Sequence, residues 1–93
     1  SSAGAEGIFP NIDRLAGELL PKSKVVGFAD SGWFLSSAPL APRKCVDAGT
    51  CTEQEGIRIG VGLWQARMND ACVAAMPPSL RYRCLLGPYV YPY

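Results

Sequence analysis

The chain has 93 residues, nine Lys or Arg against eight Asp or Glu, a net charge of +1 and a hydrophobic content of 48%. This length allows one small domain or a piece of one, and the composition is that of a folded globular chain. With so little net charge, no nucleic-acid partner is expected. Because the chain contains no His, a complete Ser-His-Asp, Cys-His or His-ligated metal site is excluded within these residues.

The two ends of the chain and the length of its apolar runs indicate what kind of protein it comes from. It begins with Ser, has no charged and apolar leader, and ends in Tyr-Val-Tyr-Pro-Tyr, which predicts an internal fragment of a longer protein. Its apolar runs are far shorter than the roughly 20 residues that a membrane-spanning helix needs. We therefore expect no transmembrane segment.

Four cysteines in so short a chain predict disulfides and an oxidising compartment. Three pairings are possible, and we favour Cys45–Cys51 with Cys72–Cys84 because each closes a short loop that contains turn residues. The alternative is four reduced thiols in a cytosolic protein. A zinc site is disfavoured because close Cys pairs and His ligands are missing, and no metal or other cofactor is expected.

The first third of the sequence predicts a helix, a tight loop and a buried strand. Apolar residues recur there at helical spacing, namely at Ile8, Ile12, Leu15 and Leu19. Pro10 predicts a kink or a restart between a first turn at 3–8 and the main helix at 11–20. Residues 25–29, Val-Val-Gly-Phe-Ala, resemble a strand buried on both faces of a parallel sheet. This order of elements predicts the α/β fold class.

Residues 36–93 predict helices and loops. Thr52 and Glu55 form a T-x-x-E capping box at the start of a helix that is expected to run from Glu53 to Asn69, with Trp64 in the core. A second short helix is expected at 70–76, and the rest of the chain as loop with one short strand.

The first residues carry the sharpest chemical signal. Ser1-Ser2-Ala3-Gly4 fits the last four positions of the G-x-S-x-G nucleophile elbow. In such a turn the serine Oγ is exposed, while the next N–H and the helix N-terminus stabilise an oxyanion. Ser2 is therefore the candidate nucleophile and the Ala3 N–H one oxyanion donor. The alternative is an ordinary stretch of small residues.

Five blocks of sequence extend this signal along the chain. They are Ser1–Gly4, Asn11–Ala16, Phe28–Leu35, Cys45–Asp47 with Cys51, and Arg83–Gly87. In one register, these blocks resemble the Notum/pectin acetylesterase family of α/β-hydrolases. The stretch at 29–35 is more similar to the Notum branch, and that at 19–22 to the plant pectin acetylesterases.

The resemblance implies a partial α/β-hydrolase catalytic domain, with elbow, helix and strand in 1–35 and a cap or pocket region with two disulfides in 36–93. It implies a secreted carboxylesterase, monomeric at full length, that deacylates a polysaccharide or a protein through a Ser2 acyl-enzyme. The His and acid of the triad would lie downstream, so the fragment alone would be inactive. The alternative is a catalytically dead member or module that binds glycan or lipid without turnover.

The resemblance also implies an acyl pocket. The matching positions are Phe34, Ile57, Leu85 and Leu86. The Notum branch has aromatic residues at the last two, so leucines there predict a preference for short acyl chains. The alternative for all four is ordinary core packing.

Asp30 ends the predicted strand, where some α/β-hydrolases carry their triad acid. The family that the chain resembles takes its acid from a later strand. We therefore assign Asp30 to a tight turn with Ser31 and Gly32.

Overall fold

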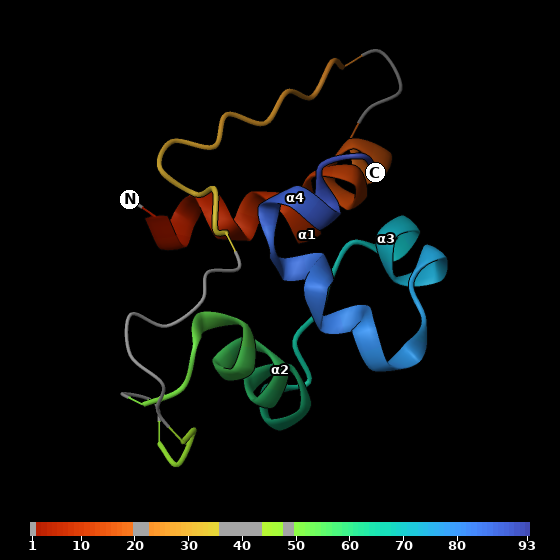
Figure 1. Cartoon of the computed structure of the whole chain (residues 1–93). Helices are drawn as coiled ribbons and strands as arrows, with labels where there is room; N and C mark the ends of the chain where they lie inside the picture. Colours follow the sequence, from red (N-terminus) through yellow and green to blue (C-terminus); the bar gives the residue numbers. More distant parts are fainter. Residues whose placement is uncertain (1, 20–22, 36–43, 48–49) are drawn as a thin grey trace.

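Helices make up the regular structure of the described residues (Figure 1). The computed structural model describes residues 2–19, 23–35, 44–47 and 50–93. In chain order the elements are α1 (Ser2–Glu18), α2 (Glu53–Trp64), α3 (Asp70–Ala75), the 3₁₀-helix η1 (Pro78–Leu85) and α4 (Gly87–Val90). No helix in the described ranges has the length and apolar character needed to cross a membrane.

The predicted α/β fold class is wrong for the part of the chain that the structure describes, which contains no strand. Residues 25–29 are unpaired and run back along α1 (Figure 1). Their side chains were expected to be buried, yet Val26 is 73% and Phe28 85% exposed. Gly27 lies against Ile12 of α1, but α1 covers one side only. A parallel strand needs hydrogen-bonded neighbours and cover on both faces.

The predicted restart of the helix after Pro10 is wrong, because α1 is one helix from Ser2 to Glu18 with Pro10 inside it; the kink stays a prediction. Proline has no N–H and disturbs the hydrogen bonds of the preceding turn. Here the Asn11 side chain donates a hydrogen bond of 2.8 Å to the Gly7 carbonyl. That bond gives the Gly7 carbonyl a side-chain partner in the turn that the proline disturbs.

The start of α2 follows the prediction. Thr52 is the N-cap, and its hydroxyl oxygen accepts a hydrogen bond from the Glu55 N–H at 3.2 Å. The Glu55 carboxylate in turn accepts one from the Thr52 N–H at 3.0 Å. The capping box is therefore confirmed, and it satisfies two backbone donors that a helix start leaves open.

This cap is expected to make stability depend on pH. The hydrogen bonds from the Thr52 backbone and side chain lower the pKa of Glu55 from its ordinary value of 4.5. Because the folded pKa is the lower one, the carboxylate stabilises the fold above the unfolded pKa, and this stabilisation disappears as pH falls through the folded pKa. We expect Glu55→Gln to destabilise the whole protein at neutral pH, in urea unfolding, and the deficit to vanish in acid.

Glu53→Gln is the matched control, because Glu53 lies in the same first turn of α2 and is exposed. Glu53→Gln should lower the stability at neutral pH by less than Glu55→Gln does. A deficit for Glu55→Gln that stayed constant from neutral pH into acid would contradict the role assigned to the carboxylate.

The end of α2 differs from the prediction. The helix stops at Trp64 because Gln65 adopts a left-handed conformation with φ of 50°, and the Gln65 N–H bonds to the Val61 carbonyl. Trp64, expected in the core, is 74% exposed. Its ring lies over Gly60 of its own helix, where an added Cβ would overlap it. Helical spacing identifies which residues share a face but not whether another element covers that face.

The chain after α2 is helical. The short helix expected at 70–76 is confirmed as α3, with Asn69 as N-cap accepting a 2.9 Å hydrogen bond from the Cys72 N–H. The expected loop with a short strand is wrong, since η1 and α4 occupy that region. Each has a proline in its first turn, Pro78 and Pro88, where the missing N–H removes no helical hydrogen bond.

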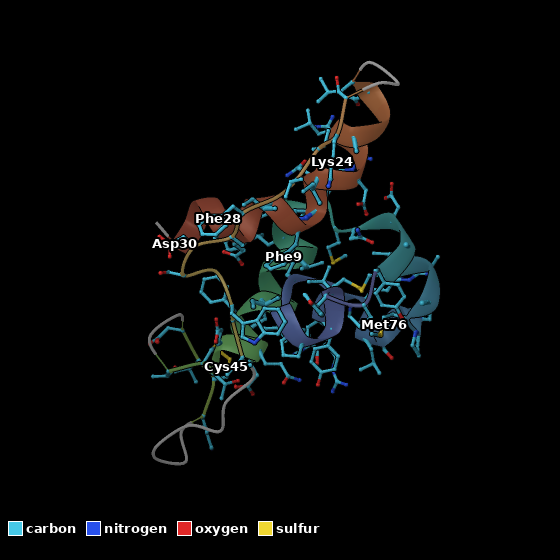
Figure 2. All side chains as sticks on the ribbon, turned by 90° about the horizontal axis from the view of Figure 1, so that it is seen from above. Phe9, Lys24, Phe28, Asp30, Cys45 and Met76 are labelled. Atoms are coloured by element: carbon cyan, nitrogen blue, oxygen red, sulfur yellow. A yellow bond between two sulfur atoms is a disulfide. The ribbon has the colours of Figure 1, made fainter. Side chains whose placement is uncertain are left out.

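The core lies where α3, η1 and α4 meet. Cys72, Cys84 and Val90 form its buried centre, and both cysteines are 0% exposed. The partly buried residues packed against this centre are Phe9, Met68, Val73 and Met76. The structure has the disulfides Cys45–Cys51 and Cys72–Cys84, the pairing favoured from the sequence. Figure 2 labels Phe9 and Met76, two of the residues that pack against this centre.

Candidate active site

The candidate nucleophile lies at the N-terminus of α1. Ser2 is the first residue of this 17-residue helix and Ala3 the second. The first N–H groups of a helix have no partner within it, and they carry a partial positive charge. The first turn of α1 contains no acidic residue that would oppose this charge. The backbone therefore has the polarity that an oxyanion needs, while the side chains of Ser2 and Ala3 lie outside the described part.

Gly32 packs against the helix one turn beyond Ser2. Gly32 and Ala5 are both buried. A Cβ on Gly32 would overlap the Ala5 side chain and lie 2.9 Å from the Ala5 carbonyl carbon. Residue 32 therefore has to be glycine for the segment 31–35 to approach α1 this closely.

Gly32→Ala is expected to destabilise the whole protein by about 1–3 kcal/mol, the usual cost of overpacking. Gly7→Ala is the matched control, because an added Cβ on that α1 residue meets nothing within 4 Å. This control should stabilise α1 by about 0.5–1 kcal/mol, since alanine is the better helix former. Urea unfolding would measure both, and equal effects of the two variants would contradict the packing argument.

Asp30 lies at a bend in the backbone, where its side chain contacts the next residue. Its carboxylate accepts a 3.1 Å hydrogen bond from the Ser31 hydroxyl, and Ser31 has a positive φ of 61°. Both residues are exposed. These contacts are local to the bend, and they supply no evidence for a catalytic role of Asp30.

Trp33 joins the segment after this bend to both ends of the chain. Its ring makes edge contacts with Phe9 of α1 at 6.4 Å and with Tyr91 at 5.5 Å between centroids. Gly87 lies directly beneath the ring, and its N–H donates to the Phe34 carbonyl at 3.2 Å. These contacts place Phe34 next to the start of α4.

The four residues expected in an acyl pocket lie on three parts of the fold. Phe34 is held beside Gly87, and Leu86 precedes that glycine and is fully buried. Leu85 ends η1 and is partly buried. Ile57 lies on α2 in an apolar groove of about 520 Å³, which also contains the Cys45–Cys51 disulfide but none of the other three. The described residues therefore do not enclose the four in one cavity.

A polar contact connects α2 with η1. Gln54 Nε2 donates a 2.7 Å hydrogen bond to the buried Tyr82 hydroxyl. The adjacent Arg83 guanidinium lowers the pKa of Tyr82, with a smaller contribution from Gln54, and lies 5.1 Å above the Tyr89 ring. No local pattern identifies the pair, because Gln54 and Tyr82 are 28 residues apart.

A second polar contact that sequence reasoning missed connects α1 with α3. The buried Asn69 donates through Nδ2 to the Asp13 carboxylate at 2.6 Å. Asn69 could have been recognised as a helix cap from its place before the helix at 70–76. Its bond to Asp13, 56 residues away, could not.

The described residues offer no other obvious chemistry. No three His, Cys, Asp or Glu side chains within them lie close enough to hold a metal ion. All four cysteines are in disulfides.

Comparison with known proteins gives relatives over the whole chain. The human palmitoleoyl-protein carboxylesterase NOTUM is 38% identical over 96 residues, which cover 99% of this chain and 19% of the relative. The Schmidtea mediterranea protein of the same name is 33% identical over 98% of this chain. The Drosophila melanogaster one is 34% identical over 99% of this chain and 13% of the relative. No protein-family model matches. The chain thus spans about a fifth, or less, of the length of these curated relatives.

Proposed function

We propose that this chain, a homologue of the Notum carboxylesterases over its whole length, is a segment of a secreted serine carboxylesterase that removes an acyl group from a protein. The observation that carries the proposal is the 38% identity over 99% of the chain to a palmitoleoyl-protein carboxylesterase. The position of Ser2 at the start of α1 supports it.

In the proposed reaction the Ser2 Oγ attacks the carbonyl carbon of the ester. The hydroxyl proton passes to a general base, a His from another part of the protein, since this chain has none. The Ala3 N–H donates to the oxyanion of the tetrahedral intermediate. The C–O bond of the ester then breaks, and the alcohol leaves with the proton held by the base. Water hydrolyses the acyl-enzyme, which releases the acid and restores the Ser2 hydroxyl.

The proposed substrate class is an acylated protein, after the substrate that the relatives' name states. Leu85 and Leu86 support a preference for shorter acyl chains than an aromatic pocket wall would favour. The two disulfides support passage through an oxidising compartment and thus secretion.

A fluorophosphonate probe, which phosphonylates activated serines, tests the proposal. On the whole protein we expect labelling at the peptide that contains Ser2, together with release of the fatty acid from a serine-acylated peptide. A folded protein that binds the acylated peptide but is neither labelled nor active would overturn the proposal and establish the non-catalytic alternative. Deacylation of acetylated pectin but not of the peptide would overturn the protein substrate alone.

A further inference from the structure

Gly32 contacts the backbone of α1 close to its N-terminus. Ala5 follows Ser2 by three residues in this helix and is 4% exposed. A Cβ at position 32 would overlap the Ala5 side chain, and it would lie 2.9 Å from the Ala5 carbonyl carbon and 3.1 Å from the Ala5 Cα. Residues three apart in an α-helix are neighbours on its surface. The contact with Gly32 is therefore within one helical turn of Ser2.

The segment that follows this glycine is held on its other side by α4. The Trp33 ring makes edge contacts with Phe9 at 6.4 Å and with Tyr91 at 5.5 Å between centroids. A Cβ on Gly87 would lie 2.8 Å from that ring, and the Gly87 N–H donates to the Phe34 carbonyl at 3.2 Å. Because the segment is anchored there, a larger residue at position 32 displaces the first turn of α1.

Gly27 also lies against α1, but it meets different atoms. A Cβ at position 27 would overlap the end of the Ile12 side chain and lie 2.8 Å from the Ile8 Cγ2. These atoms belong to side chains, which can turn to another rotamer, whereas the backbone at Ala5 can give way only if the helix moves. The Gly27 contacts also lie six and ten residues after Ser2.

We infer that Gly32 is a positioning residue for Ser2: its lack of a side chain lets the segment 31–35 pack against Ala5, which fixes the first turn of α1. This inference rests on the proposed esterase function. Gly32 touches no reacting atom in the proposed reaction and acts through Ala5. A shift of the first turn moves Ser2 and the Ala3 N–H relative to the ester, and a misplacement of about 1 Å can lower a rate by about 10²-fold.

The test compares the whole protein with its Gly32→Ala and Gly27→Ala variants, each measured per mole of folded protein. One readout is the rate constant for phosphonylation of Ser2 by the fluorophosphonate probe. The other is Kd for a serine-acylated peptide in which an amide replaces the ester. We expect Gly32→Ala to lower the rate constant about 10- to 100-fold while Kd stays unchanged. Gly27→Ala, the matched control, should change neither quantity.

Two further variants separate positioning from a loss of stability. Gly32→Ala combined with Ala5→Gly removes the side-chain atom that the new methyl group overlaps, so it should recover part of the lost rate. Trp33→Phe shortens the anchor of the segment and should lower the rate constant in the same direction, by a smaller factor. It also keeps the test available if Gly32→Ala does not fold.

The outcomes that overturn the inference differ from those that overturn the proposed function. An unchanged rate constant in Gly32→Ala, or in Trp33→Phe where Gly32→Ala does not fold, would overturn the inference. An equal loss of rate in Gly27→Ala and Gly32→Ala would do the same. If the unaltered protein were not labelled, or if labelling survived Ser2→Ala, the proposed function itself would be overturned, so the two failures are distinguishable.

Discussion

Replacement of Ser2 by Ala is expected to reduce ester hydrolysis by the whole protein by about 10⁴-fold or more, as loss of a catalytic serine does in other acyl-transfer enzymes. The variant keeps the Ala3 N–H and the rest of α1, so substrate binding should persist while the acyl-enzyme cannot form. The measurement is kcat/KM for p-nitrophenyl butyrate, with binding of an uncleaved acyl analogue measured in parallel.

Ser79→Ala is the control, since it removes the hydroxyl of an exposed serine in η1, and it should leave kcat/KM within about twofold, as surface changes usually do. If Ser2→Ala retained most of the activity, the nucleophile would have to be a different residue. If the variant lost binding as well as turnover, the serine would be structural.

Removal of the buried disulfide is expected to have the largest effect on stability. The double variant Cys72→Ala, Cys84→Ala should lower the free energy of unfolding by about 3–5 kcal/mol. The change raises the conformational entropy of the unfolded chain and also leaves a cavity at the centre of the core. Both cysteines are fully buried, and Phe9 of α1 packs against them. Urea unfolding of the whole protein, together with the secreted yield, would measure the loss.

The other disulfide supplies the comparison. Cys45 and Cys51 are only partly buried and close a loop with a sequence separation of 6, against 12 for the core pair. Their replacement by Ala should lower the free energy of unfolding by about 2 kcal/mol, mainly because the unfolded chain gains entropy. Equal losses for the two pairs would contradict the importance of core burial.

Local chemistry made several features of this chain predictable. The capping box at Thr52 needs only two side chains and the backbone between them, so its pattern predicted the start of α2. The helix α3 is followed by Pro77 and Pro78, which limit how far it can extend. Cysteines that are close in sequence meet at low entropic cost, which is why the local pairing was favoured. Each of these contacts is complete within about a dozen residues.

The predictions that were wrong concern features that depend on other parts of the chain. The segment 25–29 has the composition of a buried strand, but composition cannot provide neighbouring strands, and its side chains are exposed in this structure. Trp64 has helical spacing like a core residue, yet it is 74% exposed and its ring lies over Gly60 of its own helix. At Pro10 the pattern indicated a kink or a restart, while α1 runs through this residue as one helix.

For the candidate site the division is the same. The sequence alone predicted Ser2 as candidate nucleophile and Phe34, Ile57, Leu85 and Leu86 as candidate pocket residues, because a motif and a resemblance are properties of residue order. Only the tertiary structure shows that Gly32 packs against Ala5 and that the Tyr82 hydroxyl accepts a hydrogen bond from Gln54. Such contacts depend on how whole helices pack, and packing is set jointly by many residues far apart in the chain.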